Sequence, residues 1–506
     1  MAAGIQSHVG IEGVNGVERT RAGRVSLVVF AVWLWSMVPP IVQRLTGPTG
    51  RASVTQEVPY SAVATLSATL LGGLLVATLL VVIVSAWRSL PHHPVAPLLL
   101  LLLPWIYMLL RGTAEGGGVD IRKVAYPLIV IAIWVLRPRL RELGAIGWVV
   151  VVTAALAIAF GVLLPEAGIF RKPTGEVIVT AKSDLPWGLL TGMFSHPNSL
   201  GQYLAIGLPF VTLIRRGLVR VAGVAIVLVA IVWSSSRTAE IAVAAAVLIS
   251  LISMAWSPPR RRLPVGMGLL ALAGAVVAVP LATTSYEAFT NRGYIWAVSR
   301  QFAAAEPVFG LGPGWYSVIG SSAGNLGPTV FHGHNQFVHT LTTGGLVGVI
   351  VISAYSLIAL WRAAARSRAT FVGAAFLASL FATCLFEVSL TFVDNTILMP
   401  VVAIPVAAIL VSRRADDGED DGGWEDDEPM PARTAYQPLP ELPDLDLPAP
   451  DLRGITQPIS VVGAGESPAT WEGDPPDPRR RPASPSGSWL RMTRLRERLQ
   501  ARRRRR

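Results

Sequence analysis

The stretch SAVATLSATLLGGLLVATLLVVIVSA, residues 61–86, decides the fold class, because none of its 26 side chains is charged. A helix of about 20 apolar residues is long enough to cross the hydrocarbon core of a bilayer. Apolar runs of this kind recur through the first 412 residues. The sequence therefore predicts an all-α, polytopic membrane protein with about 12 transmembrane helices. The candidate spans are 25–42, 61–86, 95–110, 124–136, 144–164, 192–214, 218–233, 238–256, 264–282, 337–361, 370–391 and 396–412.

Three of these spans leave an alternative open. Residues 95–110 and 124–136 are shorter than the others, so that either helix could be tilted or partly re-entrant. Residues 25–42 follow a basic segment, as the apolar core of a signal peptide does. Because they are followed by many more apolar runs and by no convincing cleavage site, we interpret them as the first membrane helix.

The composition agrees with a membrane protein. The chain has 506 residues, of which 52% are hydrophobic and 15% charged, whereas soluble domains carry about 25% charged residues. The net charge of +11 belongs to the apolar part, since residues 1–412 hold 27 basic and 14 acidic side chains. These charges lie in short clusters between apolar runs, which argues against a nucleic-acid partner. The single cysteine, Cys384, excludes an intramolecular disulfide.

The arginine clusters predict the orientation, because short cytoplasmic loops are rich in Arg and Lys. The clusters fall on alternate sides of successive spans, so that one face takes nearly all of them if both termini are cytoplasmic. Lysine is nearly absent and arginine abundant, with many Ala, Gly and Pro, which fits a GC-rich bacterial genome. We therefore expect a bacterial inner-membrane protein, and the clusters predict that both termini are inside. The clusters are Arg19/Arg21/Arg24, Arg88, Arg137/Arg139/Arg141, Arg215/Arg216/Arg220, Arg260/Arg261/Arg262, Arg362/Arg366/Arg368 and Arg413/Arg414.

The chain divides into three parts. Residues 1–24 form a cytoplasmic N-terminus, 25–412 form the membrane domain, and 413–506 form a cytoplasmic tail. The tail begins with a block of acidic residues, continues Pro-rich, and ends in RLRERLQARRRRR. Low hydrophobicity and blocks of like charge predict that the tail is disordered. Its terminal arginines either bind anionic lipid of the inner leaflet or remain solvated.

The longest predicted outer loop runs from about 283 to 336. Residues 294–303 in it predict a short amphipathic helix, and the glycines that follow with Pro313 predict a turn. Loops of this length are usually functional or disordered, and the aromatic residues in this one favour an ordered, functional loop.

Four polar motifs converge on the predicted outer face. They are SHPNSLGQY (195–203), SSSRTAE (234–240), Asn291–Arg292 and FHGHNQFVH (331–339). Ionisable residues at membrane depth or at helix mouths are costly, so such residues are candidates for function. The other face shows simple arginine clusters, which indicates that the outer motifs form a site.

Arg237 and Arg292 are candidates for an anion site. A guanidinium at a dry helix mouth suits the bidentate binding of a phosphate. For Arg237 the alternative is an ion pair with Glu240 on the same helix. For Arg292 the alternative is an ordinary loop arginine.

His334 is the candidate general base, because an imidazole titrates near neutrality and nearby arginines favour its neutral form. His332 and His339 lie close to it, which raises the question of a metal site. The loop has few acids and the chain lacks HExxH and CxxC motifs, so we expect no metal. The alternative for His334 is that it simply caps a helix. The same choice stays open for His196, which with Pro197 and Asn198 is typical of a helix start.

Taken in order, these motifs resemble the bacterial O-antigen ligase-like family. The family also includes polymerases of O-antigen, exopolysaccharide and teichuronic acid. The resemblance covers roughly residues 20–412 and leaves the tail outside. The matching stretches are FSHPNSLGQYL (194–204), SSSRT (234–238), NRGYIW (291–296), FGLGPGWY (309–316) and GHNQFVHTLTTGGLVG (333–348).

The resemblance implies a GT-C-like helical fold and a metal-independent, cofactor-free glycosyltransferase. Such an enzyme moves a glycan from polyprenyl diphosphate to an acceptor hydroxyl on a glycan or lipid, with inversion. Arg237 and Arg292 match the arginines thought to hold the diphosphate, and His334 matches the proposed base. His332 and His339 lie close enough to confuse that assignment. We expect further substrate contacts from Asn335, His339, His196 and Asn198.

A transporter or flippase of lipid-linked saccharide is the main alternative. It should place ionisable residues near mid-membrane and show duplicated halves, and we find no internal repeat. Glu387, in the eleventh span, is the main exception. It could be a relay carboxylate or simply the partner of an arginine. A scaffold that recruits partners through its tail would leave the outer motifs unused.

Overall fold

The computed structural model describes residues 6–47, 60–86, 93–114, 121–171, 176–177, 183, 185–317, 332–393 and 396–412. The predicted tail, 413–506, and residues 318–331 of the long loop lie outside the described residues. Within the described part the protein is helical, with two isolated β-bridges, so the predicted all-α class is confirmed. The helices are α1 (Gln6–Thr46), α2 (Ala62–Ser85), α3 (Val95–Ala114), α4 (Ile121–Leu136), η2 (Leu140–Leu143), α5 (Gly144–Leu163), α6 (Pro165–Gly168), α7 (Pro197–Val211), α8 (Gly217–Ser234), α9 (Arg237–Ala255), η3 (Pro258–Arg260), α10 (Arg262–Ala282), α11 (Ala288–Ala303), α13 (Gln336–Arg366), α14 (Val372–Cys384), η4 (Thr396–Leu398) and α15 (Ala403–Val411).

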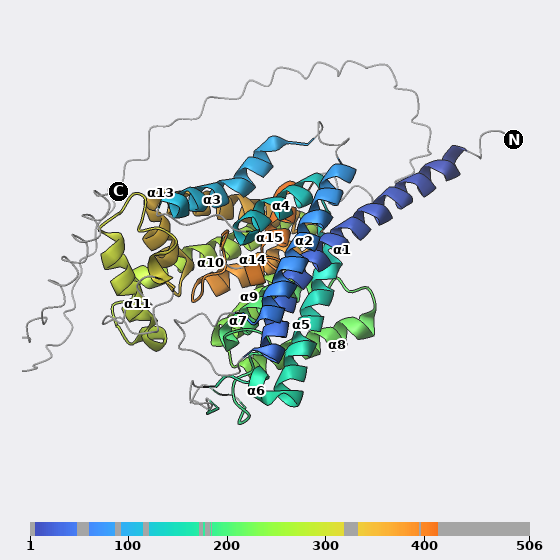
Figure 1. The fold of residues 1–506 in the computed structure, drawn as a ribbon. Coiled ribbons are helices and arrows are strands. Elements are labelled where there is room, and N and C mark those ends of the chain that lie inside the picture. Colours follow the sequence, from blue (N-terminus) through green and yellow to red (C-terminus); the bar gives the residue numbers. More distant parts are fainter. Residues whose placement is uncertain are drawn as a thin grey trace, which may run out of the picture. The chain divides into compact units, whose positions relative to one another are not determined.

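The described helices confirm a polytopic helical membrane protein. Eight of them are long and apolar enough to cross a bilayer, and two more, Lys123–Leu136 and Val372–Cys384, are shorter apolar helices. Figure 1 shows α1, α2 and α5 side by side in the bundle. Each predicted span contains a helix, although α7 and α15 fall below the length of a full span. The count of twelve crossings and the GT-C-like arrangement stay predictions.

One end of the bundle is held by arginines. Arg137 after α4, and Arg362 and Arg366 of α13, all donate to backbone carbonyls at the C-terminus of α15. Arg21 of α1 pairs with Glu142 of η2 at 2.7 Å. An α-helix leaves its last carbonyls without intrahelical donors, so these arginines cap α15. We name this the arginine end. The acceptors are the oxygens of Ile409, Leu410, Val411 and Ser412.

The opposite helix ends meet at the other side of the bundle, which we name the site end because it holds His334. The amide of Ser61 before α2 donates to Gln43 Oε1 of α1 at 2.7 Å. Arg111 near the end of α3 donates to the backbone oxygen of Gly310 at 2.7 Å. α13 thus begins at the site end and finishes at the arginine end, as the predicted alternation requires.

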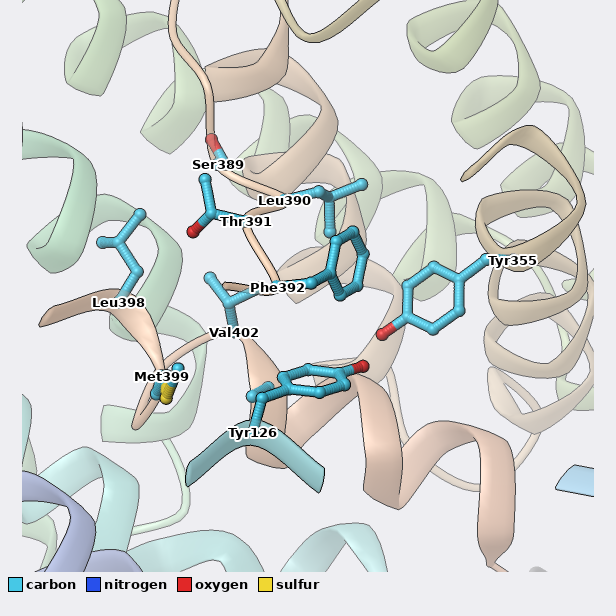
Figure 2. Close-up of a pocket in the computed structure, with 10 residues that line it drawn as sticks. Tyr126, Tyr355, Ser389, Leu390, Thr391, Phe392, Leu398, Met399 and Val402 are labelled. Atoms are coloured by element: carbon cyan, nitrogen blue, oxygen red, sulfur yellow. The ribbon is translucent and has the colours of Figure 1, made fainter. Parts of the chain in front are cut away.

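The chain between α14 and α15 differs from the prediction. α14 ends at Cys384, whereas the predicted span runs to 391, and the described residues that follow it up to 393 are mostly buried and form no α-helix. Figure 2 shows Phe392 near Tyr126 of α4 and Tyr355 of α13, with ring centroids 5.3 Å and 5.6 Å away. The space between them is about 10 Å³, the lower limit for one water molecule. This segment is therefore part of the core.

Candidate functional site

Asn335 fixes the start of α13. It is the N-cap, and its Oδ1 accepts from the amide of Val338 at 2.9 Å, as asparagine commonly does at this position. Its Nδ2 donates to the backbone oxygens of Val276 in α10 and Leu385 after α14, at 2.9 Å and 3.0 Å. Asn335 is fully buried. Its amide therefore ties three elements together, and its predicted substrate contact stays untested.

Gln336 holds the chain that follows α14. Its Oε1 accepts from the amides of Ser389 and Leu390 at 3.1 Å and 2.8 Å, and its Nε2 donates to the oxygen of Leu390 at 3.1 Å. Buried backbone groups need partners, and here a side chain supplies what a helix would have supplied. The segment can therefore leave helical geometry at Cys384, and it carries Glu387 to the start of α13.

A left-handed turn precedes Arg292. Phe289, Thr290 and Asn291 have φ values of 52°, 62° and 66°, and right-handed helix begins only at Arg292. A left-handed backbone conformation costs a residue other than glycine roughly 1–2 kcal/mol, so packing must compensate for this cost. The Phe289 ring lies 5.5 Å from Trp296 and 5.2 Å from Phe386. This contact places Arg292 beside the residue after Phe386. From that point onward the predicted amphipathic helix 294–303 is confirmed.

Glu387 lies at the centre of the resulting cluster. Its Oε1 accepts from Arg292 Nη2 at 2.5 Å and from Asn198 Nδ2 at 2.9 Å. Its Oε2 faces His332 Nε2 at 3.5 Å and His334 Nδ1 at 3.6 Å. The glutamate side chain is 7% exposed. A buried carboxylate is stable only when paired, and here four side chains from α7, α11 and the loop before α13 surround it.

His334 has a strained backbone, and its amide determines which ring nitrogen of a neutral His332 carries the proton. His334 has a φ of 44°, and its amide donates to His332 Nδ1 at 2.9 Å. Because Nδ1 of His332 accepts, a neutral His332 carries its proton on Nε2, which faces Glu387. Burial, and secondly the charge of His334, lower the pKa of His332 well below its ordinary value, against a smaller raising effect of Glu387. The accepting Nδ1 and this direction both favour the neutral form of His332, with Nε2 toward Glu387.

The same three residues raise the question of a metal ion. Ligand atoms of His332, His334 and Glu387 lie within 4.8 Å of one another. A histidine ligand must present a lone pair, whereas Nε2 of His332 carries a proton in this hydrogen-bond pattern. The other carboxylate oxygen already binds Arg292, whose positive charge would oppose a cation. This arrangement fits two histidines grouped around an arginine-paired carboxylate better than a metal site.

The two residues predicted on α7 have different positions. His196 is the N-cap of α7, and its Nδ1 accepts from the amide of Asn198 at 3.1 Å while its ring packs against Phe170. The helix-start interpretation of His196 is therefore confirmed. Asn198 instead contacts Glu387 and belongs to the cluster.

His339 lies one turn into α13 and does not contact Glu387. Its ring stacks on Tyr316 of the long loop, with centroids 5.1 Å apart and an interplanar angle of 14°. Its buried Nδ1 has no hydrogen-bond partner among the residues that the structure describes. The stacking fixes the loop against α13, which is a structural reason for a histidine here.

Arg237 is the first residue of α9, and its side chain is exposed. Within the described ranges it makes no hydrogen bond or ion pair, so the alternative pair with Glu240 is not formed there. Gly201 allows α7 to approach this helix start, since an added Cβ would lie 2.6 Å from the Cβ of Ser236. The backbone of Arg237 therefore lies beside the turn of α7 that contains Asn198.

Two features were missed or left open by the sequence reasoning. Arg44, at the end of α1, donates to the backbone oxygen of Phe194 at 2.5 Å and fixes the loop before His196. The sequence signal that could have identified Arg44 is a single arginine at the end of an apolar run. For Glu387, the alternative that it pairs with an arginine is confirmed, and the partner is Arg292.

Residues 222–353 match a family model described as O-antigen ligase. The match runs from α8 into α13 and includes Arg237, Arg292, His334, Asn335 and His339. It confirms the resemblance predicted from the motifs. A comparison with curated proteins found no match.

Proposed function

Because residues 222–353 match the O-antigen ligase family, which indicates membrane glycan transfer in polysaccharide biosynthesis, we propose that this protein is a glycosyltransferase. It takes a glycan from a polyprenyl-diphosphate carrier and transfers it to an acceptor hydroxyl on a glycan or lipid. The reaction takes place at the outer face of the bacterial inner membrane, without a metal or cofactor.

The observation that carries the proposal is the meeting of Arg292, His334 and Glu387 at the site end. They come from α11, from the turn before α13 and from the segment after α14, and they are close in space although far apart in the chain. Strained backbone at 289–291 and at His334 supports a functional interpretation, because such strain clusters at active sites.

The residues fit the steps of the reaction. The bond between the sugar and the diphosphate oxygen breaks, and a bond to the acceptor oxygen forms. The diphosphate departs with the bonding electrons, and guanidinium groups of Arg237 and Arg292 stabilise its charge. The acceptor proton passes to His334, which acts as general base. An imidazole protonated at Nδ1, toward Glu387, would present Nε2 to the acceptor.

A cavity beside the site supports a lipid-linked donor. It holds about 260 Å³ and lies between α10, α13 and α14, bounded at one end by Gln336 and Thr340. Apolar side chains such as Leu270, Val277 and Ile352 form most of its wall. Apolar cavities of about 150 Å³ already bind a benzene molecule, so this one has room for part of a polyprenyl chain. The cluster and the cavity share the start of α13.

The test compares lipid carriers from cells with and without the protein. We expect glycan to accumulate on polyprenyl diphosphate in cells that lack it, as complete chains for a ligase or as single repeat units for a polymerase. A transporter would also leave carrier-linked glycan, but on the cytoplasmic side, where an added outer-face glycosidase cannot reach it. No accumulation at all would contradict both functions.

A further inference from the structure

We propose that Glu387 is a positioning residue that couples donor binding to the base. In the structure its carboxylate binds Arg292, and when a diphosphate takes Arg292 the carboxylate is left to the imidazole of His334. This inference rests on the proposed function for the identity of the donor. The charge exchange itself concerns only three side chains and a diphosphate.

The two carboxylate oxygens of Glu387 contact different partners. Oε1 lies on the Arg292 side, with Asn198 as a second donor, and Oε2 lies on the histidine side. One carboxylate therefore touches both a proposed donor ligand and the proposed base. The distances to the two histidines, 3.5 Å and 3.6 Å, leave room for these contacts to shorten.

The carboxylate cannot swing away to solvent. It is buried, and Asn335 and Gln336 bind the backbone on both sides of it, at Leu385 and at Leu390. A buried charge that loses its partner is costly unless another partner takes over. If Arg292 turns to a diphosphate, the described side chains left beside the carboxylate of Glu387 are the two imidazoles and the side-chain amide of Asn198.

The groups that face His334 determine the sign of the effect. They are Glu387 after α14, His332 in the same turn and His339 of α13, with Arg292 of α11 bound to the other oxygen of Glu387. Of these described groups, Glu387 alone is negative. Loss of its charge disfavours the imidazolium, and loss of Arg292 favours it. Donor binding, which withdraws Arg292 and adds negative charge, makes His334 the stronger base.

The experiment follows the pH dependence of His334 in the purified full-length protein. Diethyl pyrocarbonate modifies neutral imidazole, and peptide mass spectrometry reports each histidine separately. We expect the midpoint of His334 reactivity to fall by roughly one pH unit in Glu387→Gln and to rise in Arg292→Gln. Inorganic diphosphate should raise the wild-type midpoint, with a smaller rise in both variants. His93 before α3, bonded to the oxygen of Val135, serves as the internal control and should not respond.

Opposite shifts in the two variants cannot come from general damage, which would move the midpoints in one direction. Partial recovery of the wild-type midpoint of His334 reactivity in Glu387→Asp would add support to the coupling. Equal midpoints in wild type and Glu387→Gln, or no response of the wild type to diphosphate, would overturn the coupling. Shifted midpoints in a protein whose loss causes no glycan accumulation would keep the Glu387–His334 pair and remove the proposed enzyme.

Discussion

At the scale of single residues, Arg237 and Arg292 differ in what they bind, although both are predicted to hold a diphosphate. Arg292 is 17% exposed and pairs with Glu387. Arg237 is exposed and has no ion pair in the described part of the protein. Arg292 must therefore exchange a contact to bind a diphosphate, whereas the described residues make no such contact with the side chain of Arg237. We infer that Arg237 makes the first contact with the donor.

This difference predicts the effect of substituting Arg237. Arg237→Ala should weaken donor binding and leave the His334–Glu387 contacts intact. Arg237→Lys should recover only part of the affinity, because an ammonium lacks the planar fork that binds phosphate bidentately. Binding of the carrier-linked donor to the purified variants checks this, with Arg220, a surface arginine of α8, as the control for lost charge. Unchanged affinity in Arg237→Ala would contradict a role in donor binding.

Residue-level prediction succeeded where one local motif was enough. The helix start at His196 and the position of the HN pair at 334–335 immediately before a helix could be predicted from neighbouring residues. The role of Glu387 could not, because it depends on a helix that stops at Cys384 when side chains from another helix bind the next backbone groups. No local pattern in the apolar run 370–391 indicates that the helix ends at Cys384.

At the scale of elements, α13 is broken where the long loop packs against it. Gly345 has a φ of 61°, and the amides of Leu311 and Gly312 donate to the oxygens of Thr342 and Thr343. In return, Leu346 and Val347 of α13 donate to the loop at Pro307 and Val308. The predicted glycine turn is therefore confirmed, and its partner is the GG pair of α13. The loop supplies hydrogen-bond partners for backbone groups of α13 that lack partners within the helix at the break.

Gly310 should be the most sensitive position of this contact. Its φ is 69°, and an added Cβ would lie 2.4 Å from the amide nitrogen of Gly345. We expect Gly310→Ala to lower the free energy of unfolding by about 2 kcal/mol or more. The apparent melting temperature in detergent measures it. Gly73→Ala in α2, where an added Cβ meets nothing within 4 Å, is the control. Equal stability of the two variants would show that the loop does not pack on α13 in this way.

At the scale of the whole molecule, the arginine clusters have two roles. Their alternation predicts the orientation, which stays a prediction, and contacts at the two ends of the bundle show only which helix ends lie together. Some of the same arginines also cap α15, which sequence reasoning did not foresee, because their acceptors lie in another helix. The polytopic helical class follows from composition, whereas the partners of each arginine require the fold.

Orientation is tested by labelling single cysteines in a Cys384→Ser background. Ser317, exposed at the site end, and Ser257, exposed between α9 and α10, lie at opposite ends of the bundle. We expect an impermeant maleimide added to spheroplasts to label Ser317→Cys and to reach Ser257→Cys only after the membrane is opened. The reverse pattern would place the site in the cytoplasm.

Turnover by the purified protein in the presence of EDTA tests the central claim most directly. The donor is the carrier-linked glycan that accumulates in cells lacking the protein. The wild type should remain fully active with the chelator. His334→Ala should bind the donor nearly normally and lose about 10²–10⁴-fold in turnover, the usual contribution of a general base. His339→Ala should be milder, since its ring packs on Tyr316 away from Glu387. A chelator-sensitive wild type, or full turnover in His334→Ala, would contradict the metal-free histidine mechanism.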